Sequence, residues 1–400
     1  MSKLVWLAIG AFAIGTQSFM IAGFLPKIAG AFDCSVGTAA YLMTIFSLSY
    51  AVSSPILSSL LAQAPRKGLL IAALGGFGVI SLLALTASSL GAMMAIQAAL
   101  AICAGLYMPT ANAVAVMVAG PERRARAISI VTGGLTLAIA LGAPIGIAVA
   151  ALGDWRIAFV LVSALSLLGV AGLAFGLPRD LPRGASTLRE RFAVAQRPGI
   201  PIALLMTIFW TMGVFVAYAH IATYLATFTG VTGLWVSAAL VMFGIGSAIG
   251  NGVGGRAADR FGAVATLRMA LIGLGTMLAL LSVIALILPP GLPATIIVFA
   301  ILAIWGGLGW AGYPAQATRL VGLAPDAAVI ALSLNASALY IGMASGAALG
   351  SLVMARGGLP ELGFVGALCE AVALAALLIA VRSQEKVAPL LPQAAPQPAE

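Results

Sequence analysis

The sequence predicts an all-α membrane protein whose twelve transmembrane helices form two pseudo-symmetric six-helix bundles. The composition, the length of the apolar runs and the position of the longest polar segment carry this prediction. Of the 400 residues, 62% are apolar and only 8% are charged, and the mean hydropathy is +1.13. A soluble domain carries about 25% charged residues, and a disordered chain needs low hydrophobicity, so both classes are excluded.

Apolar runs of about 20–27 residues recur along the chain. This length suits a helix that crosses a bilayer, whereas membrane strands would give alternating segments of about 10 residues. The first run has only Lys3 as a charged flank and no polar, cleavage-like region, so we expect a retained helix rather than a signal peptide. The predicted spans cover about residues 4–25, 37–61, 69–88, 92–118, 127–151, 157–177, 200–226, 235–255, 265–288, 294–320, 329–355 and 362–381.

The basic residues fall almost entirely on one side of these spans. Seventeen of the 20 Lys and Arg residues, Arg319 among them, lie on the side of both termini, and only Lys27, Arg156 and Arg356 lie on the other. Because positive residues stay in the cytoplasm during insertion, we expect a multi-pass protein of the cell inner (plasma) membrane with both termini cytoplasmic. The net charge of +9 is therefore a topology signal, and no nucleic-acid partner is expected.

The longest polar segment divides the spans into six and six. We predict a first bundle at residues 1–177, a cytoplasmic linker at 178–199, a second bundle at 200–381 and a disordered cytoplasmic tail at 382–400. The linker contains a short basic amphipathic segment at about residues 187–196. This segment would lie either on the anionic inner leaflet or in solvent as an ordinary part of the linker.

The two halves also match at a constant offset of 204 residues. Pro121-Glu122, Ser129 and the run Gly142–Gly146 correspond to Pro325-Asp326, Ser333 and the run Gly346–Gly350. Internal repeats are typical of transporter folds, which place the binding site where the repeats meet, near the bilayer midplane. The match therefore predicts that any site lies between the two bundles.

Small residues and prolines mark several spans. Gly342, Gly346 and Gly350 recur at a spacing of four, as do Gly246 and Gly250. Such faces let helix backbones approach closely in lipid, either as static packing or as a surface that slides. Within Gly142–Gly146, Pro144 removes a backbone hydrogen bond and predicts a kink; Pro55, Pro109 and Pro314 also lie inside spans.

A short glycine-bounded segment follows the eighth span. Gly255-Arg256-Ala257-Ala258-Asp259-Arg260-Phe261-Gly262 is expected to form a cytoplasmic loop between two spans. Asp259 could cap a helix end or pair with an arginine, which would stabilise one conformation. An ordinary charged turn that fixes topology is the alternative.

These motifs resemble those of the major facilitator superfamily. The run Gly255–Gly262 is similar to the superfamily's loop motif G-x-x-x-D-R-x-G, and Gly142–Gly146 resembles the fifth-span motif of its proton-antiporting drug exporters. Four further segments resemble the drug and sugar efflux branch of this superfamily. They are Trp155-Arg156 with Phe159, Gly15-Thr16, Ala22-Gly23-Phe24-Leu25-Pro26 with Ile28-Ala29, and residues 121–127. The resemblance covers about residues 4–381. It implies two bundles that alternate access to a central site and a proton-coupled, antiporting efflux activity of the multidrug-resistance type.

Three positions depart from the family pattern, and each is neutral. Ala62 stands where the first-half loop motif has an acid, Gln97 replaces a fourth-span arginine, and Ser18 replaces a first-span acid. Two ionisable residues remain inside the spans, His220 in the seventh and Glu370 in the twelfth. A charge at the bilayer centre costs at least about 2.5–3.5 kcal/mol, so His220 and Glu370 are the candidates for carrying a coupling proton, with a neutral histidine and a protonated glutamate held by neighbouring helices as the structural alternatives.

The candidate substrate-binding residues are polar and aromatic side chains on spans that line the centre by resemblance. They are Gln17, Tyr41, Asn112, Trp210, Tyr218, His220, Trp305, Trp310, Tyr313, Asn335 and Tyr340. Aromatic rings provide stacking and cation–π surfaces, while amides orient a ligand. Because this set contains no acid, it predicts a neutral or amphipathic small molecule rather than a strong cation.

The resulting prediction is a transporter that exports such a molecule, a drug or a metabolite. An uncoupled facilitator or uptake permease is the alternative within the class, and a transporter-like membrane sensor is the alternative outside it. No G-x-x-x-x-G-K-[ST] motif occurs, and one histidine with three scattered cysteines offers no metal or disulfide pattern. We therefore expect no enzyme, no cofactor and no metal, and a monomer in the bilayer.

Overall fold

A computed structural model of the chain describes residues 2–61, 63–119, 124–178, 181 and 188–387. Within these residues the regular elements are all helical, and twelve helices are long and apolar enough to cross a membrane. The predicted all-α membrane fold is therefore confirmed. The predictions for Ala62, for Pro121-Glu122 and for the tail after Val387 lie outside the described residues, as does most of the linker before Leu188.

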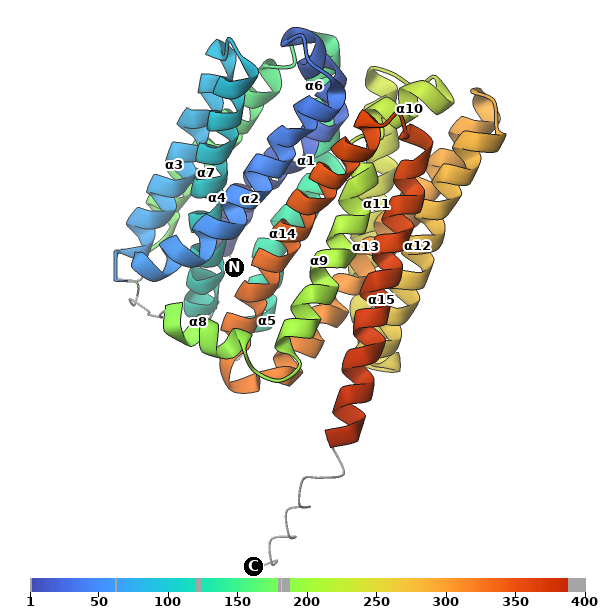
Figure 1. Cartoon of the computed structure of the whole chain (residues 1–400). Coiled ribbons are helices and arrows are strands. Elements are labelled where there is room, and N and C mark those ends of the chain that lie inside the picture. The colour runs from blue at the N-terminus through green and yellow to red at the C-terminus, as the bar shows by residue number, and fades with distance from the viewer. Residues whose placement is uncertain (1, 62, 120–123, 179–180, 182–187, 388–400) are drawn as a thin grey trace, which may run out of the picture.

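The first six spans pack against one another on one side of the molecule (Figure 1). They are α1 (Ser2–Ala31), α2 (Val36–Leu60), α3 (Arg66–Leu83) with the short η1 (Ala84–Thr86), α4 (Leu90–Ala119), a composite fifth span and α7 (Ile157–Gly176). The fifth span consists of α5 (Arg124–Leu137), the π-helical η3 (Ala138–Gly142) and α6 (Ala143–Leu152).

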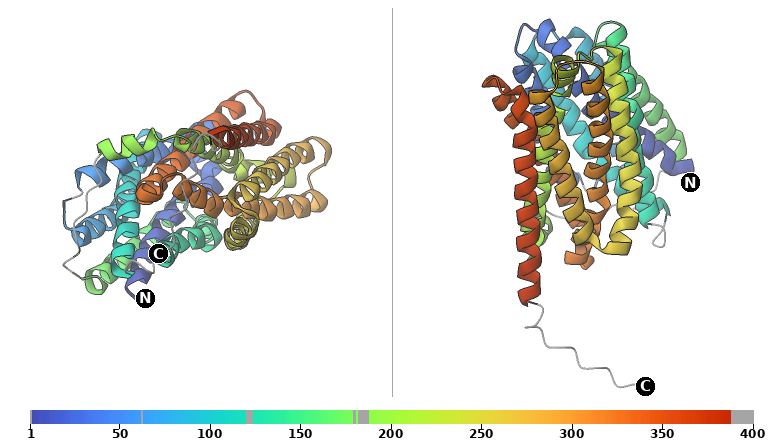
Figure 2. Two further views of the ribbon diagram at one scale, coloured as in Figure 1. Left: turned by 90° about the horizontal axis from the view of Figure 1, so that it is seen from below. Right: turned by 90° about the vertical axis from the view of Figure 1, so that its right-hand side faces the viewer.

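The last six spans form the second bundle. They are α9 (Ile200–Tyr218) with α10 (Ile221–Thr229), α11 (Leu234–Phe261), α12 (Ala263–Ile287), α13 (Leu292–Leu323), α14 (Ala328–Ala355) and α15 (Leu362–Val387), with 3₁₀ turns η4 (Pro325–Ala327) and η5 (Leu359–Glu361). The short α8 (Leu188–Ala195) lies in the predicted linker. Figure 2 shows the bundles side by side from below, and α15 reaching beyond its neighbours.

The two bundles meet along two helix pairs. One pair is α2 with α14, and the other is α11 with η3 and α6. In Figure 1, α6 and α10 mark the upper end of the molecule and α8 marks the lower end, and these names are kept below. The contact surface between the bundles is called the seam.

Three helix boundaries differ from the prediction. The first span continues to Ala31 because Pro26 is accommodated behind a kink at Phe24, whose φ of −128° is not helical. The twelfth span continues to Val387. The eighth span continues to Phe261, so most of the predicted loop motif is helical instead.

Proline and histidine interrupt two spans. The fifth span passes through the π turn of η3 just before Pro144, which is where the missing proline N–H would weaken a regular helix. The seventh span breaks at Ala219–His220, where His220 adopts φ −110° and ψ 15°. Pro55, Pro109 and Pro314 lie inside continuous helices as predicted.

Several of the few basic residues satisfy helix ends. Lys27 on α1 donates to the carbonyls of Ala150 and Gly153 at the end of α6. Lys67 on α3 donates to the carbonyls of Ala174 and Leu177, at 2.7 and 2.6 Å, at the end of α7. The last carbonyls of a helix have no intrahelical partner and favour a cation, so these lysines fasten neighbouring helices at both ends of the first bundle.

Candidate functional site

The centre of the seam holds two stacked tyrosine rings, one from each bundle. Tyr50 on α2 and Tyr340 on α14 have ring centroids 3.6 Å apart and an angle of 23° between their planes. Phe46, one turn from Tyr50, lies 6.5 Å from the Tyr340 ring. Tyr340 was predicted as a binding residue, whereas Tyr50 and Phe46 were not.

Hydroxyl groups surround this stack. The Tyr313 side chain on α13 lies close enough to Tyr50 and Tyr340 to interact electrostatically with both hydroxyl groups. Ser54 lies beside the Tyr50 hydroxyl, and Ser18 on α1 lies beside that of Tyr340. These residues of four spans, Tyr50, Tyr340, Tyr313, Ser54 and Ser18, are called the tyrosine site. The site is uncharged, and it can stack on an aromatic ring and exchange hydrogen bonds with it.

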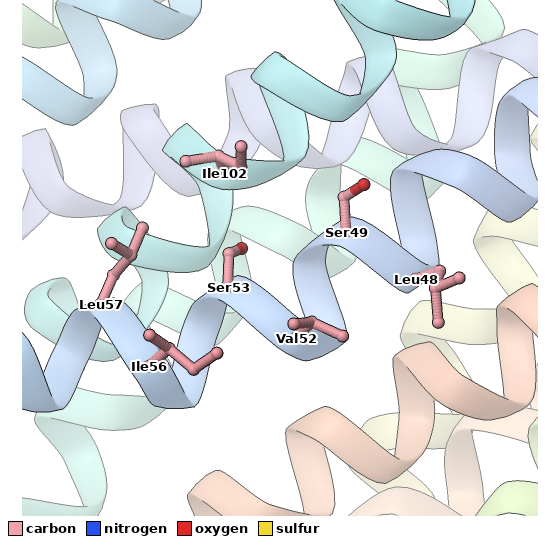
Figure 3. Close-up of a pocket in the computed structure, with 7 residues that line it drawn as sticks. All are labelled: Leu48, Ser49, Val52, Ser53, Ile56, Leu57 and Ile102. Carbon is pink, nitrogen blue, oxygen red and sulfur yellow. The ribbon is translucent and has the colours of Figure 1, made fainter.

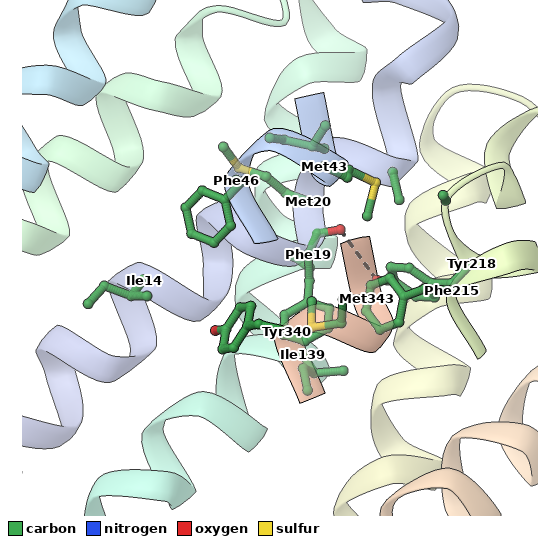
Figure 4. Close-up of a cluster of buried hydrophobic side chains, with 14 of the residues drawn as sticks. Ile14, Phe19, Met20, Met43, Phe46, Ile139, Phe215, Tyr218, Tyr340 and Met343 are labelled. Atoms are coloured by element: carbon green, nitrogen blue, oxygen red, sulfur yellow. Dashed lines mark hydrogen bonds between the residues drawn. The ribbon is translucent and has the colours of Figure 1, made fainter. Parts of the chain in front are cut away.

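A second aromatic cluster fills the seam nearer its upper end (Figure 4). The Tyr218 hydroxyl on α9 donates to the carbonyl of Phe19 on α1 at 3.3 Å, and so joins the two bundles. The Tyr218 ring packs edge-on against Phe19 and Trp305, with centroids 6.0 and 6.5 Å apart. Trp305 is fully buried and its indole N–H has no partner among the described residues. Tyr218 and Trp305 thus serve as packing here rather than as an open surface.

Gln17 lies inside the first bundle and is fully buried. Its side-chain amide donates to Oε1 of Gln97 on α4 at 2.7 Å. The Oε1 of Gln17 and the Nε2 of Gln97 have no partner within the described part of the chain. The position that resembles the family's fourth-span arginine is thus occupied by one half of a neutral amide pair.

Asn335 belongs to a polar network inside the second bundle. Thr207 on α9 donates to the Asn335 side-chain oxygen at 2.8 Å. Gln316 on α13 donates to Thr207 Oγ1 and to the carbonyl of Ala203, each at 2.9 Å. These bonds tie α9, α13 and α14 together toward the lower end of that bundle.

His220 lies at the break between α9 and α10, with 1% of its surface exposed. Both ring nitrogens are buried and have no partner among the described residues. The ring packs on Gly350 of α14, where an added Cβ would lie 3.1 Å from Nε2. His220 therefore lies in a contact between helices of one bundle, close to the seam but not in the tyrosine site.

Glu370 is buried in the second bundle, away from the seam. It is 1% exposed, and neither carboxyl oxygen has a partner within the described residues. It packs between Gly213 on α9, where an added Cβ would lie 2.6 Å from Oε1, and Gly275 on α12. The glycines provide the space that the carboxyl group occupies.

Arg319 is a buried basic residue near the C-terminal end of the tenth span. It lies inside α13, is 7% exposed, and its three guanidinium nitrogens have no partner among the described residues. The predicted span 294–320 already contains Arg319, and α13 extends only three residues further, to Leu323, so the placement of Arg319 on the side of both termini stays a prediction.

The remaining predicted binding residues are scattered. Trp210 is buried against Gly312 of α13 inside the second bundle. Trp310 is half-buried and contacts Tyr313, with ring centroids 5.8 Å apart. Asn112 is half-buried, and its Oδ1 has no partner in the described part of the chain. Tyr41 is 40% exposed. Of the predicted set, the structure therefore brings Tyr313 and Tyr340 together at the stacked tyrosines, with Trp310 beside Tyr313, and brings Tyr218 and Trp305 together in the second aromatic cluster.

The glycine motifs form the same helix pair in both bundles. Gly142 and Gly146 pack on Thr16 and Met20 of α1. Their counterparts 204 residues later, Gly346 and Gly350, pack on α9, the first helix of the second bundle. These faces lie within a bundle, so they form close packing there rather than a surface between bundles.

The segment Gly255–Gly262 was expected to be a loop, and this is corrected. Residues up to Phe261 continue α11, and only Gly262, with φ 85°, separates α11 from α12. Asp259 is exposed and forms no ion pair with any described residue. Arg260 lies over the ring of Phe261 at 5.3 Å.

Arg191 of α8 joins the two bundles at the lower end. Its guanidinium donates to Ser333 on α14 at 2.6 Å and to Ser58 on α2 at 3.0 Å. The side chain is 8% exposed. The linker segment is therefore neither free in solvent nor aligned only with lipid, because its central arginine is inserted between the bundles.

A shallow groove of about 470 Å³ lies on the surface of α2 and α4 (Figure 3). It is lined by Leu48, Ser49, Val52, Ser53, Ile56, Leu57 and Ile102. Leu48 and Val52 are more than half exposed, so this groove lies on the outer face of the bundle rather than in the tyrosine site. Among the described residues, no group of three potential metal ligands occurs.

The fold and the seam define a membrane transporter of two bundles, and the sequence comparison gives its family. The profile of the Major Facilitator Superfamily matches residues 7–328. The chain therefore belongs to this superfamily.

Relatives of similar length carry transporter names. The MFS-type transporter YbcL of Bacillus subtilis is 32% identical, covering 96% of this chain and 97% of the relative. The inner membrane transport protein YdhP of Escherichia coli K12 is 30% identical, covering 95% and 96%. A chloramphenicol resistance protein of Streptomyces lividans is 28% identical, covering 64% and 67%. A general transport function across a membrane follows.

Solved structures share the fold. The nucleoside transporter NupG superposes with a TM-score of 0.71 at 13% identity, covering 95% of this chain and 100% of NupG. A bacterial homologue of the lysosomal transporter Spinster, in an inward-facing and occupied conformation, gives a TM-score of 0.72 at 18% identity, covering 96% and 97%. At these identities the match concerns the fold alone.

Proposed function

We propose that this protein exports a small neutral or amphipathic molecule, a drug or a metabolite, by alternating access of its two bundles. The observation that carries the proposal is the tyrosine site, where Tyr50 of one bundle meets Tyr340 of the other. In transporter folds built from repeats, a midplane site shared by both halves is reached from either side as the halves rock. The neutral residues around the stack favour an uncharged solute, because a charged one would lose its hydration without gaining a partner.

Chloramphenicol is the first molecule to test, because a relative bears the name chloramphenicol resistance protein and because it is uncharged. Purified full-length protein is reconstituted into vesicles, and uptake of radiolabelled chloramphenicol is followed with and without an imposed pH gradient. Export coupled to protons predicts protein-dependent movement that accelerates when the gradient favours antiport. Protein-dependent flux at the same rate with and without the gradient would contradict antiport and indicate an uncoupled facilitator.

His220 is the residue we propose for proton coupling. Its imidazole titrates near neutral pH in water. Each unpaired polar atom inside a protein costs about 1–3 kcal/mol, which favours a functional reason for two ring nitrogens that have no partner among the described residues. Glu370 is the second candidate, farther from the seam. We expect His220→Ala to reduce gradient-driven flux at least tenfold and Glu370→Gln to reduce it less, as measured in the same vesicles.

Substrate exchange without a gradient provides the control for both substitutions. A coupling role predicts that exchange survives His220→Ala while gradient-driven flux is lost. Equal loss of both activities would indicate a folding or packing defect, and full gradient-driven flux in His220→Ala would remove His220 from coupling.

We propose that the lower end faces the cytoplasm, in line with the side on which the basic residues gather. Cys34, in the connection between α1 and α2, then faces the outside, whereas Cys103 and Cys369 lie within spans. Burial, and then the charge of Asp33, raises the pKa of the Cys34 thiol. Because the thiolate is the reactive form, labelling of intact cells by an impermeant maleimide should accelerate about tenfold per pH unit below that pKa.

Cys34→Ser should abolish this labelling. Labelling that appears only after the cells are permeabilised would reverse the proposed orientation. The proposal also assigns no catalytic residue and no cofactor, and because one chain holds the complete tyrosine site, a monomer is sufficient.

A further inference from the structure

The Tyr50–Tyr340 stack differs from the other aromatic contacts of the seam. Phe19 meets Phe215 and Tyr218 at angles of 46° and 84°, which are ordinary tilted and edge-on contacts. Tyr50 and Tyr340 instead lie nearly face to face, with centroids 3.6 Å apart. Aromatic pairs usually prefer offset or edge-on arrangements with centroids 4.5–7 Å apart, so this pair presents two parallel π faces at direct contact.

The surroundings of the stack are polar but uncharged. Tyr313, Ser54 and Ser18 contribute hydroxyl groups around the two rings. Among the described residues, the titratable groups that interact with Tyr50 and Tyr340 are tyrosines. Both rings are buried, with 3% of Tyr50 and 9% of Tyr340 exposed. A solute bound here leaves water, which disfavours an ion and favours a neutral molecule with one or two hydrogen-bonding groups.

We infer that the rings of Tyr50 and Tyr340 are the two walls of a binding site for an uncharged, planar aromatic solute, which inserts between them. This inference rests on the proposed function and narrows its substrate class from neutral or amphipathic molecules to neutral aromatic ones. In the described conformation, the face of each tyrosine ring packs on the other. A planar aromatic ring inserted between them would give each tyrosine a new aromatic face to pack on. A saturated ring system of similar size is puckered, and it offers dispersion contacts but no π face.

Insertion has a mechanical consequence because the walls belong to different bundles. An aromatic layer is about 3.5 Å thick, so the walls must separate by about that distance to admit it. Because Tyr50 lies on α2 and Tyr340 on α14, the inference entails that α2 moves relative to α14 when the solute enters. Occupancy of the site is thus linked to the relative position of the bundles.

The test compares two alcohols with fused ring systems of similar size, the planar 2-naphthalenemethanol and its puckered, saturated counterpart decahydro-2-naphthalenemethanol. Each is radiolabelled and bound to the full-length protein in lipid nanodiscs, and empty nanodiscs measure partition into lipid. We expect the naphthyl compound to bind about tenfold more tightly than the saturated one. Tyr50→Leu and Tyr340→Leu should reduce that preference to less than twofold, while Tyr50→Phe and Tyr340→Phe should retain it.

Several outcomes would overturn the inference. The inference fails if the two alcohols bind equally, or if no displaceable binding of the naphthyl compound is found. It also fails if both leucine variants still prefer the naphthyl compound. If the leucine variants fail to fold, as judged by size-exclusion chromatography, the comparison of the two alcohols on the unaltered protein and on the phenylalanine variants still decides.

Vesicle exchange separates this inference from the proposed function. Protein-dependent exchange of both alcohols at one rate would overturn the aromatic site and leave transport standing. The protein could instead bind the naphthyl compound tenfold more tightly and yet exchange neither alcohol nor chloramphenicol. That result would overturn the proposed transport and leave the aromatic binding site standing.

Discussion

The upper and lower ends of the seam are joined by different kinds of contact. In the upper half the backbones of the two bundles touch. A Cβ added to Gly37 of α2 would lie 3.3 Å from the carbonyl of Ser351, and one added to Gly244 of α11 would lie 2.8 Å from the carbonyl of Ile139. Ser237 also donates to the Pro144 carbonyl there at 2.6 Å. At the lower end, the Arg191 side chain of the linker spans from α2 to α14.

This difference indicates which end is easier to open. Close backbone packing weakens quickly when helices separate, because a gap of about 0.5–1 Å already forfeits a quarter to a half of each dispersion contact. Hydrogen bonds from an arginine at the edge of the protein are replaced by bonds to water at a net cost of about 0.5–1.5 kcal/mol for a neutral partner pair, or about 1.5–3 when one partner is charged. In the described conformation, the upper end is therefore the tightly sealed one and the lower end is held by a releasable bridge.

The largest expected effect comes from disrupting the upper contact. Gly244→Leu places a side chain against Ala140 and Ile139 of η3, so the bundles cannot close there. We expect loss of transport in vesicles, with the protein still eluting as one species in detergent. Gly252→Leu is the matched control on the same helix, because an added Cβ there meets no atom within 4 Å. Normal transport by Gly244→Leu would show that this contact does not seal the pathway.

An intermediate effect is expected at the lower end. Arg191→Met removes the bridge to Ser58 and Ser333 while preserving much of the side-chain volume. We expect the thermal unfolding midpoint to fall by about 1–3 °C. We also expect a broader distribution of distances between spin labels placed on the lower ends of α2 and α14. Arg189→Met, at an exposed position of the same helix, should change neither. A narrow, unchanged distance distribution in Arg191→Met would mean that the serines approach without the arginine.

The smallest effect concerns an ion pair outside the seam. Arg197 and Asp326 form a two-bonded pair at 2.6 and 2.8 Å, but both side chains are at least a third exposed. Water and salt screen such pairs. We expect Arg197→Ala to lower the unfolding midpoint less than Arg191→Met does, and the difference from the unaltered protein to vanish in 1 M NaCl, as measured by differential scanning fluorimetry. A salt-resistant loss larger than that of Arg191→Met would assign this pair a role in joining the bundles.

The elements that the sequence predicted well have local causes. Span length follows from bilayer thickness, and the matched glycines at an offset of 204 residues pack on the first helix of each bundle because small residues at a spacing of four form one helix face. The error at Gly255–Gly262 also has a local cause. Its glycines and charged residues were interpreted as the end of a span, whereas α11 continues through them to Phe261.

The site was less predictable, because it depends on which faces of distant helices meet. Tyr313 and Tyr340 were expected, but Tyr50 was not, since a tyrosine on the second span has no local mark that distinguishes it from Tyr41, which is 40% exposed. Arg191 was read as part of a basic linker, and its partners Ser58 and Ser333 lie 133 and 142 residues away. No spacing rule connects such residues.

By itself, the sequence determined that the chain crosses the membrane twelve times, that its halves correspond, and that the centre lacks strong charge. These properties follow from composition and from the helical period, which act over one span at a time. Only the tertiary structure decided that Tyr50 faces Tyr340, that His220 lies against Gly350, and that Arg191 joins the bundles. Those pairings depend on how two packed bundles dock, and docking is set by the shape of whole helix faces rather than by any one segment.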